Sequence, residues 1–202
     1  MVVGPPGGFI EGNTTIALAL IMIVLFKGSA LIGTSQSQEV LAATKDLAAA
    51  VARFRSTYGY LPGDMPDASV RLPGVLACNT ATSTANGDGN GRIDASEVPC
   101  VTEHLFRAGL IRSNAAISFS TTKGIITMRV IARSASALAA SFPSSTRNVI
   151  EVATVPCQIA QDLDSKTDDG NFATGNTRAS VASCTVDGAN DPVPLVGVAF
   201  RE

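Results

Sequence analysis

Two hydrophobic patterns follow one another in the first third of the chain. Residues 16–26 (IALALIMIVLF) form an unbroken apolar run inside residues 14–33, a stretch whose only charge is Lys27. Twenty helical residues span about 30 Å, the thickness of the hydrocarbon core of a bilayer. A lysine at the centre of that core costs about 2.5–3.5 kcal/mol, and less if its amine reaches the interface. The pattern predicts a membrane-spanning helix. Two interpretations of Lys27 remain open: a signal anchor that contains one polar residue, or a helix that at times leaves lipid for a protein assembly, where Lys27 can find a partner.

From residue 38 onward the apolar positions become periodic. They recur in steps of four and three at Val40, Thr44, Leu47, Val51, Phe54 and Tyr58. This spacing defines one face of an amphipathic helix, and most charged residues of the segment fall off that face. Gly59 and the turn at residues 61–64 (LPGD) end the pattern. We therefore expect residues 9–58 to form one helix, with its first half in a membrane and its second half packed on a globular domain.

The rest of the chain predicts an α+β domain. Residues 64–100 are rich in proline and small polar residues and are expected to be loop-like. Short helices are expected at residues 102–111, capped by Thr102, and at residues 156–166. Strand-like runs occur at residues 116–120, 124–132, 148–154, 181–186 and 195–200. The expected fold is one long helix on a small antiparallel sheet of about four strands, with disulfide-closed loops.

The predicted organisation has four parts. Residues 1–8 contain two prolines and three glycines and form a leader, residues 9–37 the membrane segment, residues 38–60 the amphipathic helix and residues 61–202 the α+β domain. Charged residues make up 16% of the chain, against about 25% in soluble proteins, which fits a membrane-embedded segment. A net charge of −2 provides no basic field for nucleic acid.

Four cysteines indicate the compartment in which the domain folds. Cys78, Cys100, Cys157 and Cys184 are widely spaced and form no C-x-x-C motif. An even number of cysteines behind an apolar N-terminal segment predicts two disulfides in an oxidising compartment. We favour the sequential pairing, Cys78 with Cys100 and Cys157 with Cys184. Free buried thiols in a cytosolic fold are the alternative.

Residues 86–97 match the twelve-residue loop that binds calcium in helix–loop–helix proteins, except that the first position is Asn instead of Asp. Gly91 permits the sharp turn, Arg92 offers its backbone carbonyl, and Glu97 closes the site. The candidate ligands are Asn86, Asp88, Asn90, Arg92, Asp94 and Glu97. Asn at the first position lowers the negative charge and the expected affinity, and a disulfide from Cys78 to Cys100 would clamp the ends of the loop. An ordinary Asn-Gly and Asp-Gly turn without metal is the alternative.

A second acidic cluster follows Cys157 and consists of Asp162, Asp164, Asp168 and Asp169. It is a secondary calcium candidate, with a solvated turn as the alternative. Nothing in the chain favours catalysis, because no nucleophile motif or phosphate-binding glycine loop is present. We interpret His104, the single histidine, as a packed or capping residue, and we expect the protein not to be an enzyme.

Several blocks of sequence resemble one family. Gly8-Phe9, followed by Glu11 and the apolar run, is similar to the processing site of type IV prepilins and type II secretion pseudopilins. The likeness continues at residues 26–29 (FKGS), 54–68 (FRSTYGYLPGDMPDA), 86–89 (NGDG), 103–111 (EHLFRAGLI) and 163–170 (LDSKTDDG), and ends at residues 174–178. The blocks span most of the chain in the family's order.

This resemblance implies a route of assembly. A prepilin peptidase would cut after Gly8, Phe9 would be N-methylated, and the helix would become the core of a filament. In the family an acidic residue meets the N-terminal amine of a neighbouring subunit. Glu11 is the candidate here, although it is third from Phe9 where the family typically has that residue fifth. Lys27 is the second candidate for assembly contacts.

The expected function is therefore that of a structural subunit of a type IV pilus or a type II secretion pseudopilus. Its expected partners are other pilin-like subunits, the prepilin peptidase and inner-membrane assembly machinery. Its expected location is the bacterial inner membrane, with one membrane pass and the domain in the periplasm, or outside the cell once assembled into a pilus. The first alternative is a signal-anchored periplasmic binding module, in one version calcium-dependent, that does not polymerise. An anchored hydrolase is a third and more remote reading.

Overall fold

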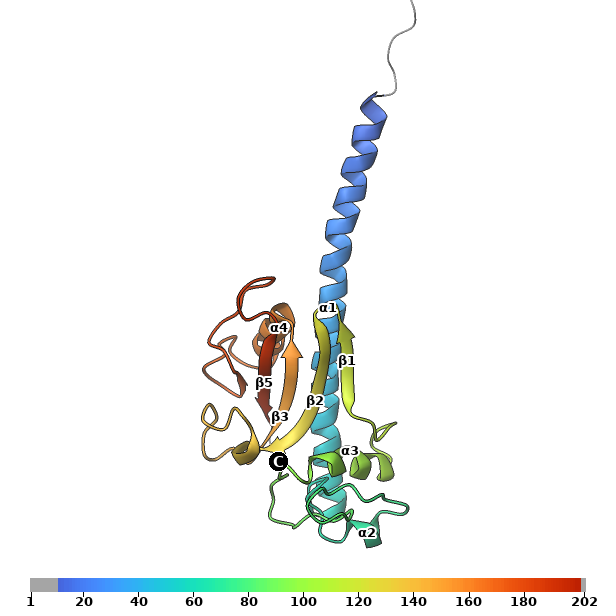
Figure 1. Cartoon of the computed structure of the whole chain (residues 1–202), viewed down its shortest axis with the longest axis vertical. Helices are drawn as coiled ribbons and strands as arrows, with labels where there is room; N and C mark the ends of the chain where they lie inside the picture. Colours follow the sequence, from blue (N-terminus) through green and yellow to red (C-terminus); the bar gives the residue numbers. More distant parts are fainter. Residues whose placement is uncertain (1–10, 201–202) are drawn as a thin grey trace, which may run out of the picture.

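The computed structural model describes the backbone of residues 11–200 and the side chains of residues 35–200. The chain is α+β, with one long N-terminal helix beside a five-stranded antiparallel sheet (Figure 1). The leader and the predicted processing residues Gly8 and Phe9 lie outside the described residues. Glu11 and Lys27 lie on the long helix, but their side chains lie outside the described part.

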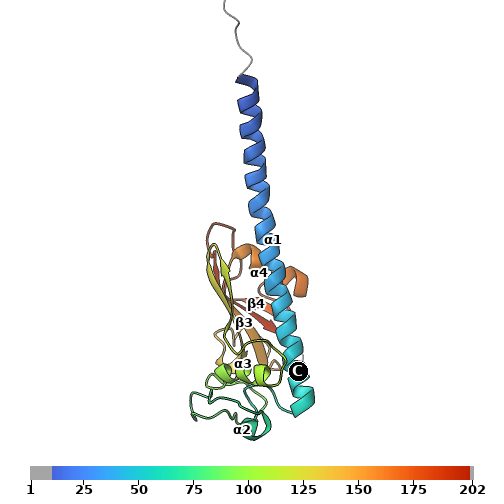
Figure 2. The same ribbon diagram turned by 90° about the vertical axis from the view of Figure 1, so that its right-hand side faces the viewer.

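The long helix, α1 (Glu11–Tyr58), is continuous for 48 residues, as the sequence predicts for residues 9–58. Its second half presents the predicted stripe to the domain, where five side chains of the stripe are at most 3% exposed: Val40, Thr44, Leu47, Val51 and Phe54. The amide of Gly59 donates to the carbonyl of Arg55 at 2.8 Å and ends the helix with φ +83°. The first half of α1 extends beyond the rest of the protein (Figures 1 and 2).

The domain contains five strands and three further α-helices. They are α2 (Ala68–Arg71), α3 (Val98–Arg107), β1 (Ile117–Thr121), β2 (Gly124–Ala132), a 3-10 turn η1 (Arg133–Ala135), β3 (Asn148–Val155), α4 (Cys157–Thr167), β4 (Thr177–Ala179) and β5 (Val193–Ala199). The strand order is β1-β2-β3-β5-β4, and each neighbouring pair is antiparallel. Central strand β3 is buried along most of its length, so it can border apolar side chains on both faces.

Two predicted elements are corrected. The helix expected at residues 102–111 begins earlier, because Pro99 takes its first turn, and it ends earlier, at Arg107. The hydroxyl of Thr102 donates to the carbonyl of Asn114 and does not cap the helix. Residues 181–186 are not a strand. Cys184 is tied to α4 by a disulfide, and residues Thr177–Ala179 pair with β5 instead. The edge strand beside β5 is therefore the short β4 and not residues 181–186.

The main core lies between α1, α3, α4 and one face of the sheet, and includes Phe54, Leu105, Ile126, Val152 and Leu163. A smaller core on residues Ile131, Leu138, Phe142 and Val149 lies elsewhere on the sheet. At Gly197 on β5, an added Cβ would lie 2.8 Å from the ring of Phe142. This glycine lets the segment after η1 approach the strand closely.

The cysteine pairing predicted from the sequence is confirmed. Cys78 bonds to Cys100 and Cys157 bonds to Cys184, and no free cysteine remains among the described residues. A search of the described residues finds no helix that is long and apolar enough to cross a membrane. The side chains of residues 16–26, on which the predicted span depends, lie outside the described part.

Candidate functional site

The predicted calcium loop packs directly on the turn that follows α1. The amide of Gly87 donates to the carbonyl of Met65, and the amide of Gly89 donates to the carbonyl of Asp64, each at 2.9 Å. A Cβ on Gly87 would lie 2.4 Å from the Gly63 carbonyl oxygen, so this contact between two backbones requires glycine. The loop and the turn therefore form one unit, although Asn86 follows Asp64 by 22 positions in the sequence.

His104 on α3 holds the same two segments together. Its Nδ1 accepts a hydrogen bond from the amide of Gly63 at 2.9 Å, and its Nε2 lies 2.8 Å from the carbonyl of Ala85. A carbonyl can only accept, so Nε2 carries the proton and the ring is neutral. Burial lowers the pKa of His104, which favours this neutral form. The buried position agrees with the interpretation of His104 as a packed residue.

Three carboxylates from the two segments come together. Oxygen atoms of Asp64, Asp88 and Glu97 all lie within 4.8 Å of one another. Asp64 is 1% exposed and Glu97 is 2% exposed, whereas Asp88 lies at the surface. Oδ2 of Asp64 accepts from the amide of Gly91 at 2.9 Å, but its buried Oδ1 has no hydrogen-bond partner in the described part of the chain.

Glu97 is held in place by the loop itself. Its Oε1 accepts from the amide of Asp88 and its Oε2 accepts from the amide of Asp94, each at 2.9 Å. A carboxylate oxygen has two lone pairs, so both atoms retain capacity for a further ligand bond. The position that the sequence pattern assigns to the closing ligand is therefore occupied by an oriented carboxylate.

The local electrostatics are unfavourable for three negative charges. Burial, reinforced by the Asp88 and Glu97 carboxylates, raises the pKa of Asp64 to about 7. Burial also raises the pKa of Glu97, with Asp88 and Asp94 adding to the effect. The cluster thus stabilises any group that neutralises it, either a proton or a cation.

The other predicted ligands take different positions. Asn90 lies beside the cluster, since its Nδ2 donates to Asp88 at 2.7 Å and lies 3.4 Å from an oxygen of Asp94. The amide of Arg92 donates to Oδ1 of Asn90 at 2.7 Å, which continues the turn. Oδ1 of Asn86 accepts instead from the amide of Ser69 in α2 at 2.9 Å.

Asp64 is the site residue that sequence reasoning missed. It belongs to the turn that ends α1, and no spacing rule connects that turn to a loop 22 residues later. The two sequence signals that could have pointed to it are the adjacent Gly63 and the excess of glycines in the loop, which allow close backbone approach.

The second acidic cluster is only partly assembled. Asp164, Asp168 and Asp169 have oxygen atoms within 4.8 Å of one another, and burial together with its two neighbours raises the pKa of Asp164 to about 6. Asp162 instead faces Lys166 on the surface of α4 at 3.7 Å. Asp168 accepts hydrogen bonds from the amides of Asn176 and Thr177, so part of this cluster organises the turn into β4.

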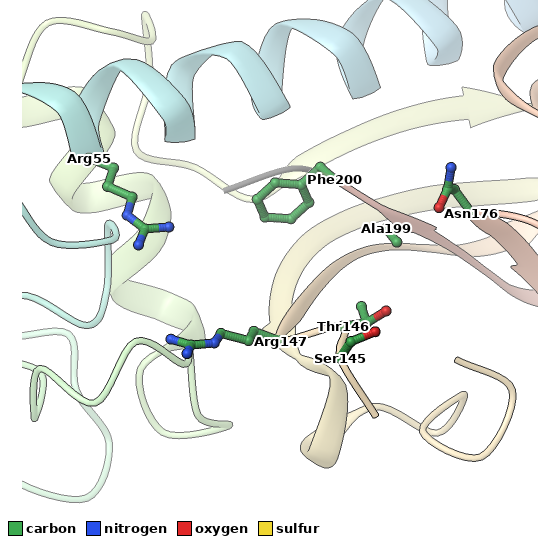
Figure 3. A pocket seen from close by; sticks show the side chains of 7 residues that line it. All are labelled: Arg55, Ser145, Thr146, Arg147, Asn176, Ala199 and Phe200. Atoms are coloured by element: carbon green, nitrogen blue, oxygen red, sulfur yellow. The ribbon is translucent and has the colours of Figure 1, made fainter. Parts of the chain in front are cut away.

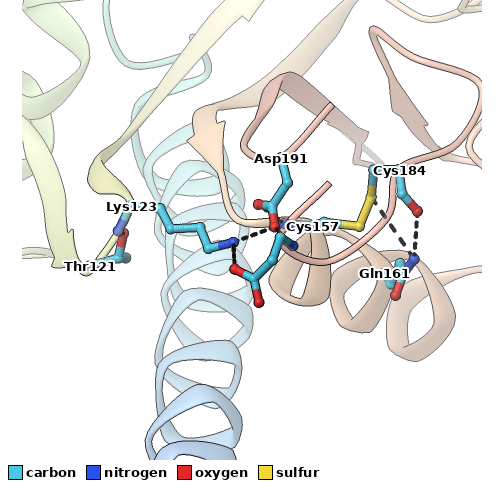
Figure 4. Close-up of polar contacts among 7 residues, drawn as sticks. Thr121, Lys123, Cys157, Gln161, Cys184 and Asp191 are labelled. Atoms are coloured by element: carbon cyan, nitrogen blue, oxygen red, sulfur yellow. Dashed lines mark hydrogen bonds and ion pairs between the residues drawn. A yellow bond between two sulfur atoms is a disulfide. The ribbon is translucent and has the colours of Figure 1, made fainter. Parts of the chain in front are cut away.

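A separate set of polar contacts fastens the second disulfide loop to the sheet. Lys123, in the turn between β1 and β2, forms an ion pair with Asp191 (Figure 4) and a second ion pair with Asp187. Asp191 also accepts from the amide of Cys157 at 3.0 Å, and Gln161 donates to the carbonyl of Cys184 at 3.3 Å. These contacts give the C-terminal loops a fixed position.

Two cavities border the end of α1. One of about 600 Å³ is lined mostly by polar residues, together with Ala199 and Phe200 (Figure 3). A smaller one of about 230 Å³ reaches Asp64, Asn90 and Gly91. Arg55 and Arg147 line both cavities. The smaller cavity gives solvent a path toward the three-carboxylate cluster.

Comparisons of the chain with protein-family models, with curated proteins and with solved structures found no match.

Proposed function

We propose that this protein is a structural subunit of a filament of the type IV pilus or type II secretion pseudopilus kind, assembled through α1. One observation carries the proposal. A helix of 48 residues is packed on the domain only along its second half, while its first half extends beyond the domain (Figures 1 and 2).

The first half of α1 needs a partner for physical reasons. Residues 16–26 are all apolar, and an isolated helix gains little stability in water without tertiary packing. Burial of apolar surface contributes about 25 cal/mol per Å², so lipid or the helices of other subunits would stabilise this segment strongly. Before assembly the lipid of a membrane would cover this segment, and after assembly neighbouring copies of α1 would cover it.

The charges of the segment suit such a transfer. Lys27 is unfavourable in lipid, and a buried ion pair stabilises only when both partners are present. Glu11 and Lys27 therefore have more to gain from contacts with other subunits than from the bilayer. In this proposal the prepilin peptidase cuts between Gly8 and Phe9 and inner-membrane machinery extracts the subunit. The domain, closed by two disulfides, folds on the periplasmic side.

The test is the chemistry of the N-terminus. The full chain is expressed in a bacterium with an active prepilin peptidase, purified from membranes, and analysed by mass spectrometry. We expect a mature chain that begins with N-methyl-Phe9, and a Gly8→Asp variant that keeps its leader. An intact Met1 on the unmodified chain, in cells that process their own prepilins, overturns the proposal.

A second candidate function is a membrane-anchored binding module that does not polymerise, favoured by the acidic cluster near the end of α1. Cysteine pairs introduced into the first half of α1 separate the two functions. Filament packing predicts ladders of cross-linked subunits in intact cells, whereas an isolated anchor predicts none.

A further inference from the structure

We propose that Asp64, Asp88 and Glu97 bind one calcium ion, and that Asp64 takes the role that the sequence pattern assigns to Asn86. The site joins the turn after α1 to the loop of residues 86–97. This inference does not depend on filament assembly, because it rests only on residues of the domain.

The first support is the buried and unpartnered oxygen of Asp64. A carboxylate that is 1% exposed has lost nearly all of its hydration, yet its Oδ1 has no hydrogen-bond partner among the described residues. Buried charges are normally paired or coordinate a metal, because desolvation is otherwise too costly. The carboxylates of Asp88 and Glu97, which have oxygen atoms within 4.8 Å of an Asp64 oxygen, add negative charge at this position. A cation between the three groups supplies the missing counter-charge.

The second support is the agreement between the site and the loop pattern. Asp88, Asn90, Asp94 and Glu97 stand at four of the positions that supply oxygen ligands in the twelve-residue loop. Asp64 enters this loop through its Oδ2, which accepts from the amide of Gly91 at the sharp turn. The side-chain oxygen of Asn86 instead accepts a hydrogen bond from the amide of Ser69. A carboxylate from outside the loop thus completes a pattern whose own first residue is neutral.

The donor set selects the kind of metal. The cluster offers only carboxylate and amide oxygens, which favour calcium or magnesium over softer metals. Cys78 and Cys100 are bonded to each other, and both ring nitrogens of His104 contact backbone groups. An irregular loop with several carboxylates suits calcium better than the strict octahedron of magnesium.

The expected affinity is modest. Arg55 and Arg147 line the cavity that reaches Asp64, and their positive charge opposes the approach of a cation. We expect a Kd in the range of extracellular modules, about 10⁻⁴–10⁻³ M. Binding at that strength orders the loop where calcium is millimolar and releases it where calcium is scarce.

The experiment is calorimetric titration of the purified full chain in detergent with calcium chloride, combined with thermal unfolding in calcium and in chelator. We expect one site that Asp64→Asn weakens about tenfold or more. In the unmodified chain, calcium at ten times the Kd should raise Tm by about 3–5 °C. Asp164→Asn serves as the matched control for the second acidic cluster and should leave this site unchanged.

A second variant distinguishes Asp64 from Asn86 without loss of a ligand. If Asn86 were the first ligand, Asn86→Asp would restore the full pattern and tighten binding by about tenfold. If Asp64 holds that role, Asn86→Asp changes the affinity by less than about twofold. Absence of heat and of any Tm shift up to 10 mM calcium, a wild-type affinity in Asp64→Asn, or tenfold tightening in Asn86→Asp each overturns the proposal. Circular dichroism of Asp64→Asn in chelator verifies that the variant is folded.

Discussion

The disulfide between Cys78 and Cys100 provides the sharpest test of how the loop region is held. The bridge closes a loop with a sequence separation of 22, and it encloses the segment that carries Asp88 and Glu97. In the chain-entropy model, removal of a cross-link of this length lowers the free energy of unfolding by about 3 kcal/mol. With a urea m-value of about 2 kcal/mol/M, the midpoint should fall by about 1.5 M. Paired alanine substitutions avoid placing a hydroxyl at buried Cys100.

The second disulfide is a matched control within the same chain. Cys157–Cys184 has a separation of 27, so the model gives a difference of only about 0.2 kcal/mol between the two bridges. Each bridge joins one buried and one half-buried cysteine. The entropic losses should therefore be nearly equal in chelator, whereas only the first pair of substitutions should weaken calcium binding.

The assay can follow the end of α1 directly. The chain has no tryptophan and two tyrosines, and these are Tyr58 and Tyr60, beside the turn that leads to Asp64. Tyrosine fluorescence in a urea titration of the full chain reports on this region. A loss well below 1 kcal/mol for the Cys78–Cys100 pair, with a loss of about 3 kcal/mol for the control, would refute the view that this bridge constrains the loop.

Three further predictions concern the packing around the site. Phe54→Ala removes a fully buried ring that contacts Tyr58 at a centroid distance of 4.5 Å, and it should lower the free energy of unfolding by about 3–5 kcal/mol. As a control, Arg53→Ala at an exposed position should change the free energy of unfolding by less than about 0.5 kcal/mol. Equal urea midpoints for the two variants would contradict this prediction. Gly87→Ala should cost about 1–3 kcal/mol, because its Cβ would overlap the backbone of the turn, and unchanged thermal stability would show that the turn can shift. Because burial lowers the pKa of His104, the stabilising effect of neutral His104 is complete above the unfolded pKa of about 6.5 and is lost as pH falls below that value. The difference in the free energy of unfolding between wild type and His104→Gln should therefore shrink between pH 7 and pH 5. A constant difference would contradict the assignment of His104 as neutral in the folded state.

The periodic parts of the chain could be predicted because one physical signal dominated each of them. The stripe from Val40 to Phe54 faces the core as its spacing requires, and β2 and β3 lie where apolar and β-branched residues gather. The prediction was wrong for two short elements, one for a local reason and one because of a tertiary contact. Pro99 starts α3 before Thr102, and the bond from Cys184 to α4 removes residues 181–186 from the sheet.

The acidic site also has one part that could be predicted from the sequence and one part that could not. Asp88 and Glu97, which come together with Asp64, could be found from the sequence because the spacing of the twelve-residue loop brings its ligand side chains to one side. Asp64 could not, since its position depends on a contact between backbones that only Gly87 allows. A pattern within one segment is visible in a sequence, whereas a site shared between segments depends on the fold.

The two proposals act at opposite ends of the molecule. The first half of α1 extends from one end of the domain, whereas α2 and α3, which flank the acidic site, lie at the other end (Figures 1 and 2). In the proposed site, calcium at Asp64 would order the segments just beyond Tyr58, which are separated from residues 16–26 by the whole packed half of the helix. Loss of the ion should therefore alter the exposed loops without removing the apolar helix from its partners. Asp64→Asn subunits should still be processed at Gly8 and cross-linked through α1, and any defect should lie in what the loops contact.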